Sequence, residues 1–304
     1  MRMIKNPIGI TNIGDPFILE WKGMYYLYAT SAEDGFLVWS SENLVHWSQP
    51  VQAYKAGRKS FGYRDFWAPE VVWNNGKFIM HYSARWKENK SLRIGAAESE
   101  SPLGPFTDVF DGKPMFDLGY AAIDGHIFKD DDGRNYIYYS RDCSENITEA
   151  GYWESHIYGA ELSEDLLHLK GNAERLIIPE QDWECGTWDM HRWTEGPYML
   201  KQGGRYYLMY SANYYASREY CIGYASSCSP LGPFVKADNN PVLGFVEGKV
   251  SGPGHNSAVC TGDGQIWCVY HVHTDYNQPG GDRQVFLDKM FITDGKLRIE
   301  GPSL

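Results

Sequence analysis

The feature of this sequence that most limits its fold is an internal repeat that occurs five times along the 304 residues. Each copy has a head residue, a short apolar run, a glycine eight or nine positions after the head, and an aromatic or β-branched run. The copies are DPFILEWKGMYYLYATS, APEVVWNNGKFIMHYSA, DGHIFKDDDGRNYIYYS, EGPYMLKQGGRYYLMYSA and HNSAVCTGDGQIWCVYH. Two extended runs joined by a glycine are typical of a β-hairpin, because tight hairpin turns need positive φ. We therefore expect five related hairpins.

A second repeat indicates that each unit is larger than a hairpin. GAAESESPLGPF, from Gly95, and GYASSCSPLGPF, from Gly223, are near copies at the same place after two of the hairpins. The heads recur at intervals of 53, 56, 71 and 60 residues, which accommodates four short strands and their loops. We predict an all-β fold, a five-bladed β-propeller that occupies residues 1–304 as a single domain. The strand-like segment FITDGKLRIEGPSL at the end of the chain is expected to pair with N-terminal residues and close the ring.

Charge and composition narrow the class of partner. The net charge is −11 and the isoelectric point is near 5.3, which argues against nucleic acid, because such binding depends on Lys and Arg that neutralise phosphates. The chain contains 11 Trp and 22 Tyr, more than a core requires, and such rings suit a site that stacks on the flat apolar faces of sugars. We expect a neutral ligand.

No part of the sequence predicts contact with a membrane. No run approaches the roughly 20 apolar residues that a span needs, and the N-terminal MRMIKNPIGITNIGDPF has no apolar region of signal-peptide length. We expect a cytoplasmic protein, with a secreted protein whose signal has been removed as the alternative.

The head residues predict a functional site. A lone acid beside Gly-Pro, such as Glu195, is usually a solvated turn residue. In a propeller, however, the innermost strands line a central channel, so residues in equivalent positions converge at one end of it. Like charges gathered in this way are costly unless they have a function. The five heads are Asp15, Ala68, Asp124, Glu195 and His255.

The motifs around these heads resemble those of glycoside hydrolase family 43, five-bladed β-propellers that cleave arabinose- and xylose-containing plant polysaccharides. GDPFI, AAIDGHIF and TEGPYML contain the three acids, and FWAPEV and GPGHNS lie between and after them. Each motif alone is unspecific, but all five occur in order, at blade spacing, over essentially the whole chain.

The resemblance implies a role for each acid. Asp15 corresponds to the general base, Glu195 to the general acid, and Asp124 to the carboxylate that orients the acid and adjusts its pKa. An inverting glycosidase needs one protonated carboxyl group for the leaving oxygen and one ionised carboxylate to activate water, roughly 6.5–9.5 Å apart. A neighbouring negative charge would keep Glu195 protonated.

The resemblance also implies three further site residues. Trp67 corresponds to an aromatic wall of the sugar pocket, with a core tryptophan as the alternative. Arg283 corresponds to an arginine that holds the third carboxylate or a sugar hydroxyl. His255 corresponds to a histidine that contacts a calcium or other cation in the channel, largely through water, with a core histidine as the alternative. The chemistry itself requires no cofactor.

The sequence thus predicts an inverting exo-glycosidase that releases terminal α-L-arabinofuranosyl, or β-D-xylosyl, residues from arabinose- or xylose-containing oligosaccharides or polysaccharides such as arabinoxylan. The near alternative is an endo-1,5-α-L-arabinanase, and the alternative from another class is a propeller that binds sugars without catalysis. Three long aromatic inserts favour a pocket over an open groove, since they could form its walls. They span residues 53–64, 143–156 and 178–192.

Overall fold

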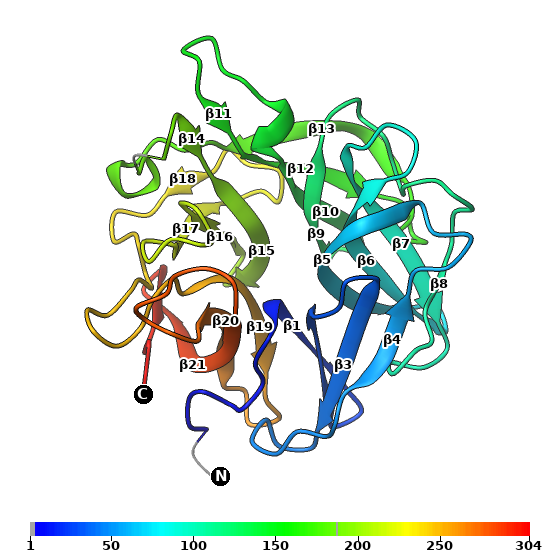
Figure 1. The fold of residues 1–304 in the computed structure, drawn as a ribbon. Helices are drawn as coiled ribbons and strands as arrows, with labels where there is room; N and C mark the ends of the chain where they lie inside the picture. Colours follow the sequence, from blue (N-terminus) through cyan, green and yellow to red (C-terminus); the bar gives the residue numbers. More distant parts are fainter. Residues whose placement is uncertain (1–3, 187) are drawn as a thin grey trace.

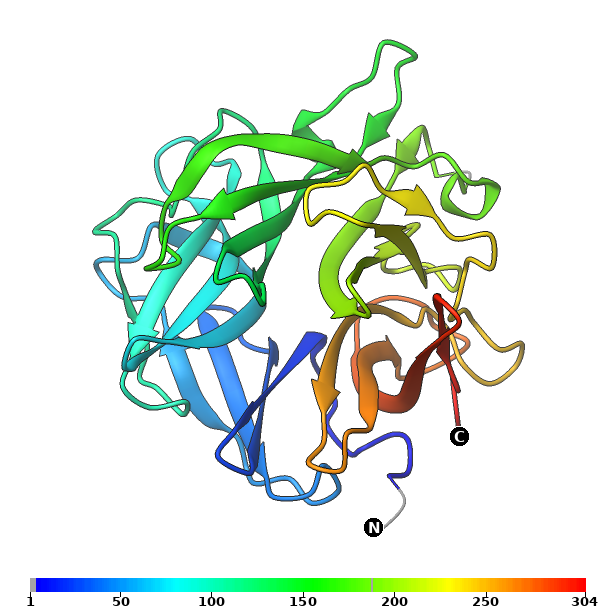
Figure 2. The same ribbon diagram turned by 180° about the vertical axis from the view of Figure 1, so that it is seen from behind.

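The computed structural model describes residues 4–186 and 188–304 and confirms the all-β, five-bladed propeller. Five four-stranded antiparallel sheets stand around a common centre, with β1, β5, β9, β15 and β19 innermost (Figures 1 and 2). Blade 1 contains β1 (Gly14–Trp21), β2 (Met24–Thr30), β3 (Gly35–Ser41) and β4 (Val51–Lys55). Blade 2 contains β5 (Gly62–Asn74), β6 (Lys77–Trp86), β7 (Leu92–Ser99) and β8 (Thr107–Asp108).

The remaining blades follow the same order from the centre outward. Blade 3 contains β9 (Ala122–Lys129), β10 (Asn135–Arg141), β12 (His156–Leu162) and β13 (Leu169–Ile177). Blade 4 contains β15 (Thr194–Gln202), β16 (Arg205–Ala212), β17 (Cys221–Ser227) and β18 (Val235–Lys236). Blade 5 contains β19 (Gly254–Cys260), β20 (Ile266–His273), β21 (Arg283–Thr293) and β22 (Lys296–Ile299). Two 3₁₀ turns, η1 (Cys143–Glu145) and η2 (Asp182–Glu184), lie in the connections around blades 3 and 4.

The hairpins form as the repeat predicts. All five predicted turn glycines have positive φ, and they are Gly23, Gly76, Gly133, Gly204 and Gly264. The aromatic second strands are buried, with tyrosines such as Tyr82, Tyr138 and Tyr270 fully enclosed between blades. The core therefore lies between neighbouring sheets.

A bulge in each innermost strand shows that one of the five predicted head positions is wrong. In every blade, two residues of the first strand oppose one residue of the second at this point. The residue of the bulge with positive φ is Asp15, Ala68, Asp124, Gly196 or His255. Glu195 was predicted to be the fourth head, but Gly196 occupies that position. Glu195 lies one residue earlier, in register with Trp67 of blade 2.

Hydrogen bonds between blades fix these bulges. The backbone N–H of Ala68 donates to Thr30 Oγ1 at 2.9 Å, that of Asp124 to Ser83 Oγ at 2.8 Å, and that of His255 to Ser211 Oγ at 2.7 Å. The acceptor in each case lies on the second strand of the preceding blade. Each bond therefore ties the head of one blade to its neighbour.

The ring closes between the N-terminal segment and blade 5. Residues 8–13 form backbone hydrogen bonds with the first residues of β21, and Asn6 donates to Leu287 O and Ser303 Oγ. The N-terminal segment therefore closes the ring on blade 5, as predicted, but its backbone pairs with a different segment from the predicted one. The backbone pairing is with β21, because β22 is the fourth strand of its own blade.

None of the helical turns in residues 4–186 and 188–304 is long and apolar enough to cross a membrane.

The bonds between blades predict a stability effect. Ser211→Ala leaves the His255 N–H buried without its acceptor, and such a loss costs about 1–3 kcal/mol. We expect a lower denaturation midpoint in urea, measured by tryptophan fluorescence. Ser144→Ala, which removes an exposed hydroxyl, is the control. Equal midpoints for the two variants would contradict the role of this bond.

Candidate active site

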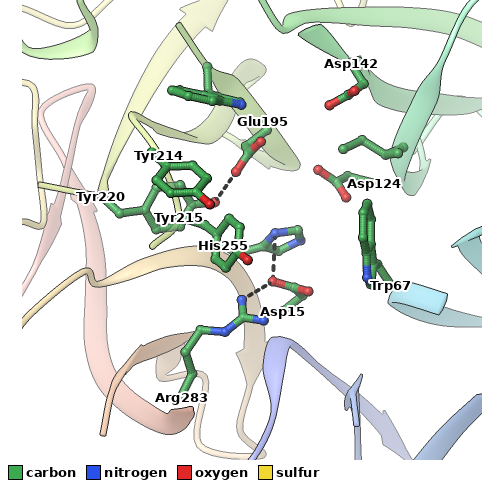
Figure 3. A pocket seen from close by; sticks show the side chains of 12 residues that line it. Asp15, Trp67, Asp124, Asp142, Glu195, Tyr214, Tyr215, Tyr220, His255 and Arg283 are labelled. Carbon is green, nitrogen blue, oxygen red and sulfur yellow. Dashed lines mark hydrogen bonds and ion pairs between the residues drawn. The ribbon is translucent and has the colours of Figure 1, made fainter. Parts of the chain in front are cut away.

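A cavity of about 240 Å³ opens at one end of the ring centre, and all six residues predicted for the site line it (Figure 3). The lining consists of Asp15, Trp67, Ile123, Asp124, Asp142, Trp193, Glu195, Tyr214, Tyr215, Tyr220, His255 and Arg283. The innermost strands of all five blades contribute to it. The structure therefore brings together residues that lie up to 268 positions apart in the sequence.

The bulges decide which side chains reach this cavity. Asp15, Asp124 and His255 each adopt positive φ, which is uncommon for residues other than glycine. Regular pleating would alternate the side chains between the two faces of each sheet, whereas the extra residue turns the head toward the channel. Such strain is tolerated because the bonds between blades hold it.

Asp15 lies among positively charged and hydrogen-bonding groups. Arg283 Nη1 donates to Asp15 Oδ1 at 3.1 Å, His255 Nδ1 lies 3.3 Å from the same oxygen, and the Thr30 hydroxyl donates to Oδ2. Burial acts to raise the pKa of Asp15, but His255, Arg283 and His271 together with the Thr30 hydroxyl outweigh it and hold that pKa well below its usual range. Asp15 is therefore ionised.

Glu195 lies in the opposite electrostatic setting. Burial and the negative charge of Asp124, with smaller effects from Asp142 and Asp15, raise its pKa well above the usual value. The Tyr220 hydroxyl donates to Glu195 Oε1 at 2.9 Å and acts in the other direction. The net effect raises the pKa of Glu195 and so favours its protonated form.

Asp124 connects these two groups. Its Oδ2 accepts the backbone N–H of Gly196 at 3.1 Å and the Ser140 hydroxyl at 3.4 Å, which ties it to the residue directly after Glu195. Burial and the Asp15 charge raise the pKa of Asp124 to about 6, against the effect of His255. At neutral pH, Asp124 is the ionised neighbour of a protonated Glu195.

Arg283 contacts a different carboxylate from the one the resemblance implied. The sequence predicted that it would hold the third carboxylate, Asp124, or a sugar hydroxyl, but its guanidinium binds Asp15 and lies over the ring of Tyr215. The reason is topological, because Arg283 begins β21 of blade 5, next to blade 1. Trp67 lies across the cavity from Glu195 (Figure 3) and packs against the apolar cluster of Leu92, Ala121 and Ile123.

His255 faces Asp15 in this structure, 3.3 Å away. Within residues 4–186 and 188–304, no group of three His, Cys, Asp or Glu side chains is arranged to hold a metal ion. Calcium prefers six to eight oxygen ligands. The residues present therefore do not fit a directly coordinated calcium, and a cation held mainly by water stays a prediction.

Six residues of the cavity were not predicted from the sequence: apolar Ile123 and five polar or aromatic residues. Asp142 follows β10 directly, Tyr214 and Tyr215 follow β16, and Trp193 precedes Glu195 by two positions. Tyr220 lies just before β17. Their place in the sequence could have indicated them, because most of them lie next to the end of a hairpin strand, at the same end of the hairpin as a head residue.

Two of the three predicted inserts adjoin residues of the cavity in the sequence, one after Asp142 and one before Trp193. Residues 143–156 and 178–192 contain the short strands β11 (Trp153–Glu154) and β14 (His191–Arg192), which pair in parallel beside blades 3 and 4 (Figure 1). The third differs from the prediction, since its residues 53–55 belong to β4 and its residues 62–64 begin β5. Tyr63 and Arg64 there line an open hollow next to the cavity.

Comparison with known proteins agrees with this geometry. The family model described as glycosyl hydrolases family 43 matches residues 4–297. The chain belongs to this family.

Relatives and solved structures of family 43 cover nearly the whole chain. A β-D-galactofuranosidase of Aspergillus niger is 30% identical over 95% of this chain and 82% of its own. An extracellular exo-α-(1→5)-L-arabinofuranosidase of Streptomyces chartreusis is 28% identical over 91% and 84%. The crystal structure of a thermostable family-43 glycoside hydrolase superposes with a TM-score of 0.94, at 50% identity, over 99% of this chain and 97% of that one. This chain is thus a glycoside hydrolase, an enzyme whose substrates are oligosaccharides or polysaccharides.

Asp142, the fourth carboxylate of the cavity, contributes to the raised pKa of Glu195, and this contribution can be measured. Asp142→Asn removes a negative charge near Glu195 at nearly constant size, so we expect the pKa of Glu195 to fall. Carboxyl ¹³C NMR of protein labelled at glutamate measures it. Asp294→Asn, at the exposed turn between β21 and β22, should leave that pKa unchanged. A Glu195 pKa that is the same in both variants would show that Asp142 does not act on the acid.

Proposed function

We propose that this family-43 enzyme is an inverting, exo-acting α-L-arabinofuranosidase that releases terminal arabinofuranosyl residues from arabinoxylan-type substrates and also accepts β-D-xylosyl residues. The observation that carries the proposal is the opposite pKa shift of two carboxyl groups in one cavity. Asp15 is held ionised and Glu195 is held protonated. These are the two states that general base and general acid catalysis require at one pH.

The proposed roles follow from these states. The Asp15 carboxylate takes a proton from a water molecule, whose oxygen attacks the anomeric carbon from one face. Glu195 donates its proton to the glycosidic oxygen as the bond between that oxygen and the anomeric carbon breaks. The products are a sugar of inverted configuration and a free alcohol. Proton exchange with solvent then restores both carboxyl groups.

Asp124 acts through Glu195 in this scheme. Its negative charge raises the pKa of the acid, and its bond to the Gly196 N–H fixes the backbone that presents the acid. Arg283 holds Asp15 in the ionised state and in one orientation. Trp67 offers a ring face for the sugar.

The size of the cavity and the relatives support terminal furanosyl release. About 240 Å³ suits one sugar unit, since clefts for larger ligands measure roughly 300–1,000 Å³. The two relatives described above are named for galactofuranose and arabinofuranose, which are five-membered-ring sugars.

One observation favours endo-1,5-α-L-arabinanase as the second candidate. An open hollow of about 910 Å³ adjoins the cavity, and Trp67 and Arg283 line both. If these two side chains allow a chain to pass, a linear arabinan could lie across the site. A relative in Emericella nidulans, 27% identical over 92% of this chain and 80% of its own, is named as a probable arabinan endo-1,5-α-L-arabinosidase.

The acid assignment predicts a dependence on the leaving group. Glu195→Gln should lower kcat/KM on arabinoxylan oligosaccharides by roughly 10²–10⁴, the usual contribution of general acid catalysis. The loss should be much smaller with 4-nitrophenyl α-L-arabinofuranoside, because nitrophenolate leaves without protonation. Asp15→Asn, the comparison variant, should impair both substrates alike. Equal losses on both substrates with Glu195→Gln would exclude it as the proton donor.

The products predict the mode of cleavage. Proton NMR of the enzyme with arabinoxylan oligosaccharides should show free β-L-arabinofuranose before mutarotation, because inversion converts an α-linkage into a β-product. Early arabino-oligosaccharides from linear arabinan would instead support the endo-acting candidate. An α-anomer as the first product would contradict inversion.

A further inference from the structure

A row of aromatic side chains extends from the cavity to rings that lie outside it. Trp193 and Tyr214 line the cavity, with ring centroids 5.2 Å apart. His191 stacks on Trp193 at 5.6 Å, and Trp153 stacks on His191 at 5.9 Å. Trp188 contacts Tyr214 at 5.8 Å and is 38% exposed. We call these five side chains the aromatic strip, and each of them is at least partly exposed.

Two rings of the strip, Trp153 and His191, lie on a small sheet that is not part of any of the five blades. β11 and β14 form the only two-stranded sheet in the described part of the chain, and they pair Trp153 with His191 (Figure 1). Beneath them, buried Glu154 is bound to His156 at 2.9 Å and to Arg192 at 3.3 Å. The rings are therefore held in place before a ligand arrives, which lowers the entropy cost of binding.

The position of the strip identifies the part of the substrate that it meets. Trp193 lies two residues before Glu195 on the same segment, so the row begins beside the proposed proton donor. Asp15 and Arg283 lie on the other side of the cavity (Figure 3). A general acid protonates the leaving oxygen, so the leaving group departs on the side of Glu195.

We infer that the aromatic strip binds the sugar chain on the leaving-group side, and that the occupant is the xylan main chain that bears the arabinofuranosyl group. This inference rests on the proposed function. The rings of the strip are partly exposed, Trp188 most clearly at 38%, and xylopyranose units offer apolar C–H faces that pack on exposed rings. The strip thus makes the enzyme selective for polymer-borne side groups over small arabinosides.

The experiment compares a polymer with a small substrate. Trp188→Ala and Trp153→Ala each remove one ring outside the cavity, so the chemistry at Glu195 is left intact. On wheat arabinoxylan we expect each variant to raise KM about five- to tenfold, a typical value for one lost ring contact. With 4-nitrophenyl α-L-arabinofuranoside, kcat/KM should stay within about twofold. Equal effects on both substrates, or none on arabinoxylan, would overturn the inference.

A matched control separates the strip from any loss of an exposed aromatic ring. Phe291 is 37% exposed and lies on β21 in blade 5, away from the strip. Phe291→Ala should leave KM for arabinoxylan unchanged. A rise equal to that of the two tryptophan variants would count against the strip.

A binding measurement keeps this inference separate from the proposed function. In a Glu195→Gln background, affinity electrophoresis in gels containing arabinoxylan should show retardation that Trp188→Ala and Trp153→Ala weaken. Retardation by the strip without hydrolysis by the wild type would reject the proposed function and retain the strip. Hydrolysis together with retardation that the variants do not change would reject the strip and retain the function.

Discussion

The structure depends on one backbone feature, the bulge near the start of each innermost strand. It places a residue at positive φ, and in blades 2, 3 and 5 the N–H of that residue is held by a hydroxyl group of the preceding blade. The same device does two things. It joins neighbouring blades, and it turns Asp15, Asp124 and His255 toward one cavity. In blade 4 the position is Gly196, and its N–H is bound by Asp124 itself, so a site residue takes the place of the structural hydroxyl.

The cavity separates two protonation states although all of its acids share one space. On one side, Arg283 and His255 adjoin Asp15 and favour its charged form. On the other, Glu195 accepts a hydrogen bond from Tyr220 and faces the charges of Asp124 and Asp142. Burial alone would raise the pKa of every one of these groups. The placement of His255 and Arg283 beside Asp15, at the junction of blades 5 and 1, therefore lowers the pKa of Asp15 while that of Glu195 is raised.

The two inserts around blades 3 and 4 add to the chemistry of the ring. They combine into the β11–β14 sheet and the aromatic strip, which begins beside Glu195 and continues the cavity outward. The ring supplies the carboxyl groups proposed for bond cleavage, while the inserts supply the surface proposed to bind the rest of a sugar chain. In such an enzyme, substitutions in the inserts can alter which polysaccharide is bound while the carboxyl groups of the cavity stay the same.

Repeats and motifs in the sequence were enough to predict the five hairpins, the ring and six of the residues that line the cavity. Glycine turns and aromatic runs are local signals, and their repetition implied that Asp15, Asp124 and His255 converge. The tertiary structure alone decided that Gly196 and not Glu195 occupies the head position, because a bulge is defined by pairing with another strand. It also decided that Arg283 binds Asp15, and that Asp142, Trp193 and Tyr220 join the cavity. These residues carry no repeat signal, and their roles depend on charges and contacts between segments far apart in the chain.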